Sequence, residues 1–179
     1  LCLAVPDGGT AAKLLDTVER MQTLYRYRVT ATFYFTAKQA EEQGDLLRRL
    51  CAMGQGIGLL IRGGSGTSVS RQLAAGNDAL CRAAGCKTRL VMLEDASEQE
   101  TAEARAAGYC CLSPGLDRAA YGGLSSVSAA SMLMKRITAR RGAVSVWLSD
   151  QVSDTGWRAF LSAARTADAR LLAQTETDA

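Results

Sequence analysis

The sequence predicts an α/β protein in which parallel strands alternate with helices along most of the chain. Runs rich in β-branched and aromatic residues, such as residues 29–35, predict buried strands. Between such runs, apolar residues recur at three- and four-residue spacings, as in residues 38–53, and predict helices with one buried stripe. Glycine follows three of these helices, at Gly54, Gly85 and Gly108. About seven strands separated by helices favour a distorted, incomplete (β/α) barrel of parallel strands over an open sheet.

The predicted elements follow one another regularly. Thr67 or Ser68 is expected to cap the third of the helices, and Ser97 the fourth. The aromatic residues between positions 25 and 35 are expected to fill the core. Strands are predicted at residues 1–5, 29–35, 57–61, 89–93, 109–112, 143–148 and 170–173, and helices up to residue 25, over 38–53, up to 84, from 97 to 107, and over 127–140 and 155–167.

Length and composition bound the possibilities. A chain of 179 residues, 47% hydrophobic and 22% charged, fits one globular domain spanning residues 1–179. Its net charge of +3 comes from scattered residues without a basic run, which argues against nucleic acid as a partner. No apolar run reaches the roughly 18 residues that a membrane span requires. Because the chain opens on Leu1 rather than methionine, we expect it to be cut from something longer.

The six cysteines match no zinc ribbon or redox motif. Cys81 and Cys86 are five residues apart, and Cys110 and Cys111 are adjacent. We therefore expect the cysteines to act as small buried apolar residues on strands and helix faces, although their pairing stays open. Trp147 and Trp157 are candidates for a sugar-stacking platform, but packing inside the protein is the commoner role of such residues.

Carboxylates follow three of the predicted strands. In barrels of this type the functional groups lie on the loops after the carboxyl ends of the strands. Asp7, Asp95 and Asp150 occupy such positions, with Ser149 beside the last of them, and together they would form an acidic cleft. The plainer alternative is that each caps the turn or helix that follows it. The chain contains no histidine, so the commonest general base and metal ligand is absent.

Four segments, in order, resemble the polysaccharide deacetylase family, carbohydrate esterase family 4. The segments are Leu-Ala-Val-Pro-Asp-Gly-Gly from residue 3, Val-Thr-Ala-Thr-Phe-Tyr-Phe from residue 29, Leu-Leu-Arg-Arg-Leu-Cys-Ala-Met-Gly-Gln-Gly-Ile-Gly from residue 46, and Gly-Ala-Val-Ser-Val-Trp-Leu-Ser-Asp from residue 142. The resemblance covers nearly the whole chain and implies a distorted β/α barrel. Active members of that family remove acetyl groups from chitin, peptidoglycan or xylan with a divalent metal such as zinc.

The resemblance also implies that the catalytic positions have changed. Active members end the first strand with Asp-Asp-Gly, whereas Pro6 stands at the position of the base and only Asp7 remains at a metal-ligand position. Leu60 and Gly64 occupy the positions of two imidazole ligands. Three further motif positions are altered: Gln55 replaces the first histidine of the second motif, Met92 lies where an arginine-proline motif is expected, and Ser149 replaces the histidine that acts as acid.

These substitutions lead to two hypotheses for the function. The first is a deacetylase-like domain without catalytic residues or a bound cofactor, which binds a glycan or a protein partner at the former cleft. The second is an active deacetylase in which Asp7, Asp95 and Asp150 surround a hard cation such as magnesium. The resemblance further implies an extracytoplasmic, cell-envelope location. The residues themselves identify neither a ligand nor an oligomeric state.

Overall fold

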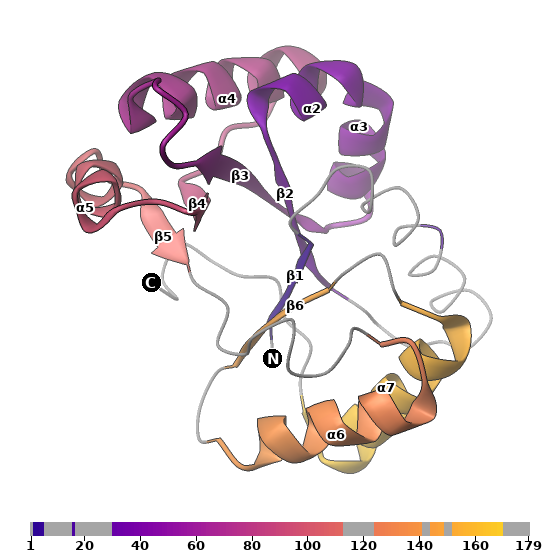
Figure 1. Cartoon of the computed structure of the whole chain (residues 1–179). Helices are drawn as coiled ribbons and strands as arrows, with labels where there is room; N and C mark the ends of the chain where they lie inside the picture. Colours follow the sequence, from indigo (N-terminus) through magenta and orange to yellow (C-terminus); the bar gives the residue numbers. More distant parts are fainter. Residues whose placement is uncertain are drawn as a thin grey trace. The chain divides into compact units, whose positions relative to one another are not determined.

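The protein was analysed as a computed structural model, which describes residues 2–5, 16, 30–112, 124–140, 144–148 and 152–169. These residues belong to two compact units (Figure 1). One unit contains the described residues up to 31 together with those from 124 onwards, and the other contains residues 32–112. The single domain expected over residues 1–179 stays a prediction.

Four parallel strands form the sheet of the unit that contains residues 32–112. Their order across the sheet is β5-β4-β3-β2, so each strand pairs with its neighbour in the sequence. A helical connection separates each pair, which is the βαβ arrangement expected from the sequence. The strands are β2 (Thr32–Phe35), β3 (Gly56–Arg62), β4 (Leu90–Glu94) and β5 (Cys110–Leu112).

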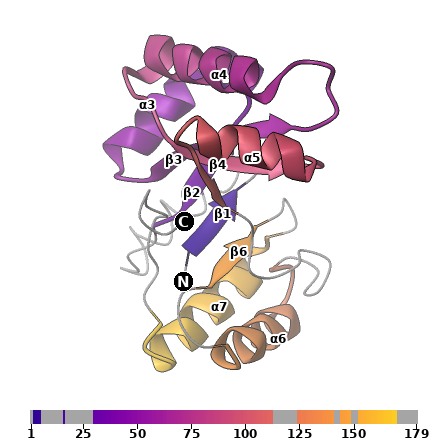
Figure 2. The same ribbon diagram turned by 90° about the vertical axis from the view of Figure 1, so that its left-hand side faces the viewer.

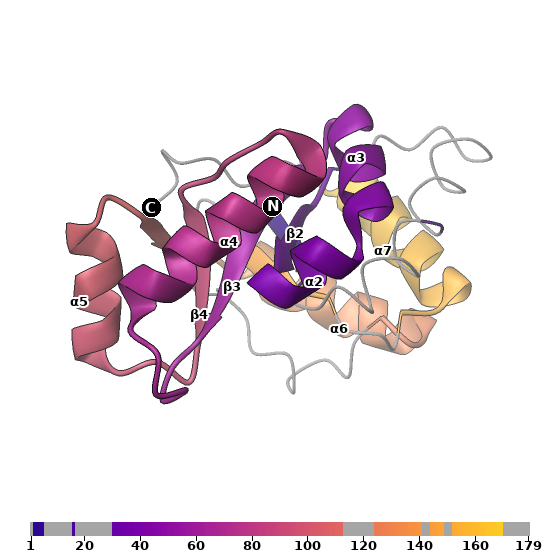
Figure 3. The same ribbon diagram turned by 90° about the horizontal axis from the view of Figure 1, so that it is seen from above.

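Helices cover one face of this sheet (Figure 3). Leu59 of β3 lies under Gly76 of α4, where a Cβ atom would stand 2.7 Å from the leucine Cδ2, so helix and strand pack closely. On the other face Tyr34 lies over Gly58, its partner in register. The helices are α2 (Ala37–Glu42), α3 (Gly44–Ala52), α4 (Val69–Ala84) and α5 (Glu98–Ala106).

The helix predicted over residues 38–53 is divided in two. Gln43 ends α2 and precedes α3 with φ −120° and ψ 39°, which is not a helical conformation. Gly44 follows directly, and glycine inside a helix costs about 1 kcal/mol relative to alanine. The predicted buried stripe is confirmed in part, because Leu47 and Leu50 are fully buried whereas Leu46 and Met53 are half-buried.

Local sequence signals account for the ends of the next two helices. Ser68 is the N-cap of α4, although its side chain makes no capping hydrogen bond, and Gly85 ends the helix in the left-handed conformation with φ 67°. Ser97 caps α5 in a capping box with Glu100, in which each side chain bonds the other residue's backbone N–H. Gly108 follows α5 with φ 82°. These boundaries confirm the prediction.

The other unit pairs residues from distant parts of the sequence. β1 (Cys2–Val5) and β6 (Ser145–Trp147) are parallel neighbours, with Leu3 opposite Val146. α6 (Val127–Thr138) and α7 (Asp154–Thr166) pack side by side (Figure 2). The buried residues of α6 recur at helical spacing and include Ala130, Leu133, Met134 and Ile137, and those of α7 include Trp157, Phe160, Leu161 and Ala164.

Six strands lie in the part of the chain that the structure describes. The seventh predicted strand, at residues 170–173, and the helix predicted up to residue 25 fall outside it, apart from a single helical residue at Asp16. The parallel α/β class is therefore confirmed, whereas the structure does not show a seven-stranded barrel. No helix among the described residues is long and apolar enough to cross a membrane.

The expectation that the cysteines are buried apolar residues is wrong for the helical ones. Cys51 on α3 and Cys81 on α4 are exposed, and Cys86 is half-buried in the connection after α4. The strand cysteines Cys110 and Cys111 are also only half-buried. Each helical cysteine lies outside the buried stripe of its helix, which Leu47 and Leu50 form in α3, so the apolar character of the residue type misled the prediction.

Candidate functional site

Most of the predicted acidic cleft falls outside the described residues. Asp7, Asp150 and Ser149 are not among them, and neither is Pro6. Asp95 is described, and it is exposed in the connection between β4 and α5 with φ 54°. Aspartate tolerates this left-handed conformation better than most residues do. Asp95 does not cap α5, because Ser97 and Glu100 do so, and the capping role considered for this residue was therefore wrong.

Four of the positions interpreted as altered motif residues are described, and they are two apolar residues, one glycine and one buried glutamine. Leu60 on β3 is 3% exposed, and its partner in register on β4 is Met92, which is 1% exposed. Gly64 follows β3 with φ 65° in open space. Gln55 is buried at the opposite end of β3, where its backbone N–H donates to the carbonyl oxygen of Leu50 over 3.0 Å. Leu60 and Met92 thus place hydrocarbon side by side on this face of the sheet.

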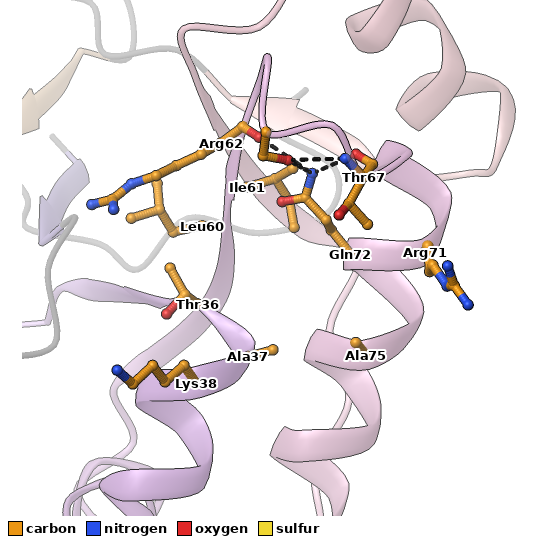
Figure 4. Close-up of a pocket in the computed structure, with 11 residues that line it drawn as sticks. Thr36, Ala37, Lys38, Leu60, Ile61, Arg62, Thr67, Arg71, Gln72 and Ala75 are labelled. Atoms are coloured by element: carbon orange, nitrogen blue, oxygen red, sulfur yellow. Dashed lines mark hydrogen bonds between the residues drawn. The ribbon is translucent and has the colours of Figure 1, made fainter.

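A cavity of about 570 Å³ opens at the carboxyl ends of β2 and β3, between α2 and the first half of α4 (Figure 4). It therefore lies at the end of the sheet where parallel α/β proteins place their ligands. Leu60 is part of its wall, so one of the altered motif positions borders it. The lining residues are Thr36, Ala37, Lys38, Leu60, Ile61, Arg62, Ser65, Thr67, Arg71, Gln72 and Ala75.

The lining of this cavity combines hydrocarbon with cations. Leu60 and Ile61 form its apolar wall, and Lys38, Arg62 and Arg71 contribute positive charge. The Arg62 Nε donates to Glu94 Oε2 over 3.0 Å, in an ion pair at the end of the sheet. The described lining contains no carboxylate, imidazole or thiol, the side chains that most often serve as metal ligands.

Gln72 of α4 holds the loop that borders the cavity. Its Nε2 lies 3.2 Å from the carbonyl oxygen of Arg62, 3.0 Å from Ser65 Oγ and 3.0 Å from the carbonyl oxygen of Thr67 (Figure 4). The side chains of this loop are exposed, but one amide group joins both ends of the loop to the first turns of the helix that follows.

Two carboxylates of α5 accept hydrogen bonds from this loop and from the first turn of α4. The Gly64 N–H donates to Glu100 Oε1 over 3.1 Å, and the Ser70 N–H donates to Glu103 Oε1 over 3.0 Å. The pKa of Glu100 is lowered by the N–H groups of Ser97 and Gly64, and that of Glu103 by the hydroxyl and N–H of Ser70. Hydrogen bonds to the ionised form favour it, so acid is expected to weaken both contacts.

We expect acidification to release Gly64 from Glu100. A carboxyl group whose pKa is lowered by folding adds stability above its unfolded pKa, about 4.3, and this contribution is lost as the pH falls through the lower folded value. The Gly64 amide chemical shift should therefore titrate in this range by NMR. Glu100→Gln should abolish the transition, and Glu103→Gln should leave it intact. A Gly64 transition that persists in Glu100→Gln would contradict the assignment.

A second, smaller cavity of about 390 Å³ lies near the amino ends of β4 and β5. Asn77 of α4 forms hydrogen bonds with two other residues that line it. Its Nδ2 donates to the carbonyl oxygen of Thr88 and to Tyr109 Oη, and its Oδ1 accepts from the Thr88 N–H over 2.9 Å. These bonds satisfy the side-chain amide of Asn77, so its role is to join α4 to the strand that follows.

Among the residues the structure describes, no group of three or more cysteine, aspartate or glutamate side chains is placed to hold a metal ion.

No protein-family model matches the sequence, and no curated protein matches it. Solved structures do match: the fold is the parallel α/β fold of the polysaccharide deacetylases. One such deacetylase, from Bacillus cereus, has a TM-score of 0.71 at 15% identity, covering 99% of this chain and 92% of its own. A carbohydrate esterase family 4 pseudoenzyme from Bacillus anthracis has a TM-score of 0.67 at 13% identity, covering 94% of this chain and 60% of its own.

A mutant of that pseudoenzyme, described as having restored enzymatic activity, matches with a TM-score of 0.66 at 13% identity, covering 93% of this chain and 61% of its own. At these identities the comparison defines the fold. The resemblance to polysaccharide deacetylases drawn from the sequence is confirmed at that level. The cavity at the ends of β2 and β3 was missed by the sequence reasoning, which singled out strand-end carboxylates and altered motif positions. Lys38 and Arg71, each in the first turn of a helix that follows a strand, were the available signal.

Proposed function

We propose that this chain is a degenerate polysaccharide deacetylase-like domain that binds a glycan or a protein partner without catalysing deacetylation. The observation that supports the proposal most directly is the cavity beside Leu60, whose described lining contains no carboxylate, imidazole or thiol. The fold of active deacetylases and of a pseudoenzyme supports the framework. We also propose that the complete sheet is an incomplete barrel of about seven strands and that the protein is located in the cell envelope.

Metal-dependent deacetylation requires three functions in one place. A metal polarises the acetyl carbonyl and binds water, a base takes the proton of that water, and an acid protonates the leaving amine. In this chain proline, leucine, glycine and serine occupy the corresponding positions, at Pro6, Leu60, Gly64 and Ser149. A site with Asp7 as its one remaining ligand falls short of the three protein ligands typical of catalytic zinc.

The cavity instead supports ligand binding. Its apolar wall at Leu60 and Ile61 suits the hydrocarbon face of a sugar ring or an apolar side chain. Lys38 and Arg71 add donors that a hydroxyl, acetyl or carboxylate oxygen of the ligand would accept. The loop beside it is held by Gln72 and Glu100, so much of the wall is formed before a ligand arrives.

The catalytic half of the proposal is tested by acetate release. The purified chain, incubated with acetylated chito-oligomers and zinc or cobalt, should release no acetate above the metal-only background, while an active polysaccharide deacetylase assayed in parallel does. Metal-dependent turnover would overturn the proposal and favour the alternative with Asp7, Asp95 and Asp150. In that case Asp95→Asn, whose position is exposed, should abolish the activity.

The binding half is tested by calorimetric titration with the same oligomers. Arg71→Ala should weaken binding by about tenfold, as the loss of one charge-assisted hydrogen bond of roughly 1.5 kcal/mol predicts. Lys135→Ala, an exposed cation on α6, is the matched control and should bind as the original chain does. Binding that Arg71→Ala leaves unchanged would exclude this cavity as the site. If no glycan binds, a protein partner becomes the proposed ligand of the cavity.

A further inference from the structure

Three cysteines lie near the place where α3 packs against the carboxyl end of α4. Cys51 lies in the last turn of α3, Cys81 in the last turn of α4, and Cys86 directly after Gly85. Cys51 and Cys81 are exposed and Cys86 is half-buried, so oxidants in solution reach the group. Neither the proposed binding cavity nor the altered motif positions use these thiols.

The face of α3 that packs on the end of α4 includes Cys51 and is directed toward Cys86. Gly44, Arg48 and Cys51 follow at spacings of four and three residues, which places them on one face of α3. The first two of these meet Ala83: a Cβ atom on Gly44 would stand 3.6 Å from the Ala83 Cβ, and Arg48 Nη1 donates to the Ala83 carbonyl oxygen over 2.5 Å. Cys51 comes one turn further along the same face.

The turn after α4 completes the approach. Gly85 has φ 67° and ends α4, so the chain leaves the helix axis directly before Cys86. Cys51 is a close neighbour of Cys86, since it acts on the ionisation of the Cys86 thiol by charge and through a side-chain hydrogen bond. Burial, followed by the neighbouring Cys51, raises the pKa of the Cys86 thiol to about 11. Cys81, the other titratable group facing Cys86, makes a smaller contribution.

We propose that Cys51 and Cys86 form a disulfide bond when the protein meets a thiol-disulfide oxidant, and that Cys81 remains a thiol. The cross-link would join α3 to the connection after α4. It would enclose β3 and the loop that borders the cavity, and so constrain the walls of the proposed binding site. This inference stands on the two thiols and their helices, and it holds whether or not the cavity binds a glycan.

The oxidation proceeds in two exchanges with a disulfide oxidant such as glutathione disulfide. The exposed Cys51 thiolate attacks one sulfur of the oxidant, a mixed disulfide forms, and one glutathione leaves as a thiolate. The Cys86 thiolate then attacks the Cys51 sulfur, and the second glutathione leaves. The two protein thiols lose two electrons and two protons, and glutathione disulfide gains both to become two glutathione molecules.

The cross-link is tested by peptide mapping of the full chain. After treatment with glutathione disulfide, trypsin digestion without reductant should give residues 50–62 joined to residues 83–87, with a mass two hydrogens below the sum of the two peptides. Cleavage after Arg82 separates Cys81, in residues 72–82, from Cys86, so the map identifies the partner directly. A link between residues 72–82 and either of these peptides, or no linked peptide, would overturn the proposal.

Cysteine variants and pH distinguish this pair from incidental oxidation. Cys51→Ser and Cys86→Ser should each abolish the linked peptide, whereas Cys81→Ser should leave its yield unchanged. Burial is the largest cause of the raised pKa of Cys86 and persists when Cys51 is in the mixed disulfide, so closure should accelerate about tenfold per pH unit from pH 7 to 9. A closure rate independent of pH in this range would contradict attack by Cys86.

Discussion

Trp157→Ala is expected to destabilise the protein by roughly 3–5 kcal/mol, the range for removing a large aromatic side chain from a core. Trp157 is fully buried on α7 and stacks on Phe160, with ring centroids 5.7 Å apart and planes 17° from parallel. Its side chain therefore packs inside the protein and does not offer a platform for sugar. Urea unfolding followed by circular dichroism measures the loss as a lower midpoint.

Trp157→Phe is the matched control for this prediction. No described group accepts a hydrogen bond from the buried indole Nε1, so its removal relieves an unsatisfied donor while the phenyl ring retains most of the stacking on Phe160. We expect a cost of about 1–2 kcal/mol, well below that of the alanine variant, because the smaller phenyl ring leaves only a small cavity. Equal losses for the alanine and phenylalanine variants would contradict a packing role for the ring.

Gly63→Ala is expected to cost about 3 kcal/mol, at the upper end for overpacking a well-filled site. A Cβ atom at this position would stand 2.5 Å from the Ala96 Cα and 2.8 Å from its nitrogen, and closer still to the Asp95 carbonyl oxygen. All three are backbone atoms, which no change of rotamer moves. The Gly63 N–H also donates to the Glu94 carbonyl oxygen over 2.8 Å, so the residue cannot shift without losing this bond.

The neighbouring glycine provides the control. Gly64 has φ 65° but nothing within 4 Å of a Cβ atom, so Gly64→Ala meets conformational strain alone, about 1 kcal/mol. Comparing the two variants by urea unfolding separates close approach from backbone conformation. A Gly64→Ala variant less stable than Gly63→Ala would contradict this account. The Gly63 variant should also weaken ligand binding, because Gly63 begins the loop that Gln72 holds beside the cavity.

Much of the fold was predictable because its signals are local. The buried strand Thr32–Phe35 is recognisable from its β-branched and aromatic residues, and Gly85 and Gly108 end their helices as expected. The division between α2 and α3 was missed, although Gly44 within an otherwise helical pattern was its signal. The exposure of Cys51 and Cys81 depends on which helix face meets the sheet, and residue type alone does not determine that.

The candidate site was less predictable than the fold. Reasoning from strand ends singled out carboxylates, of which Asp95 lies in the described part of the chain, exposed and outside the cavity lining. The cavity depends on the separation of α2 from α4 and on the bonds of Gln72, both of which are tertiary features. Leu60 was singled out from the sequence as an altered motif position, and this interpretation stays a prediction, whereas its place in the cavity wall follows only from the path of β3.

The order of the strands has a consequence for the kinetics of folding. Within residues 32–112 every strand pairs with its immediate neighbour in the sequence, so each pairing closes one helical connection, the longest of which runs over residues 63–89. β1 and β6, by contrast, belong to opposite ends of the chain and must find each other across most of its length. Because long-range pairings form more slowly, the four-stranded sheet is expected to assemble first and the pairing of β1 with β6 to limit the rate at which the native state appears.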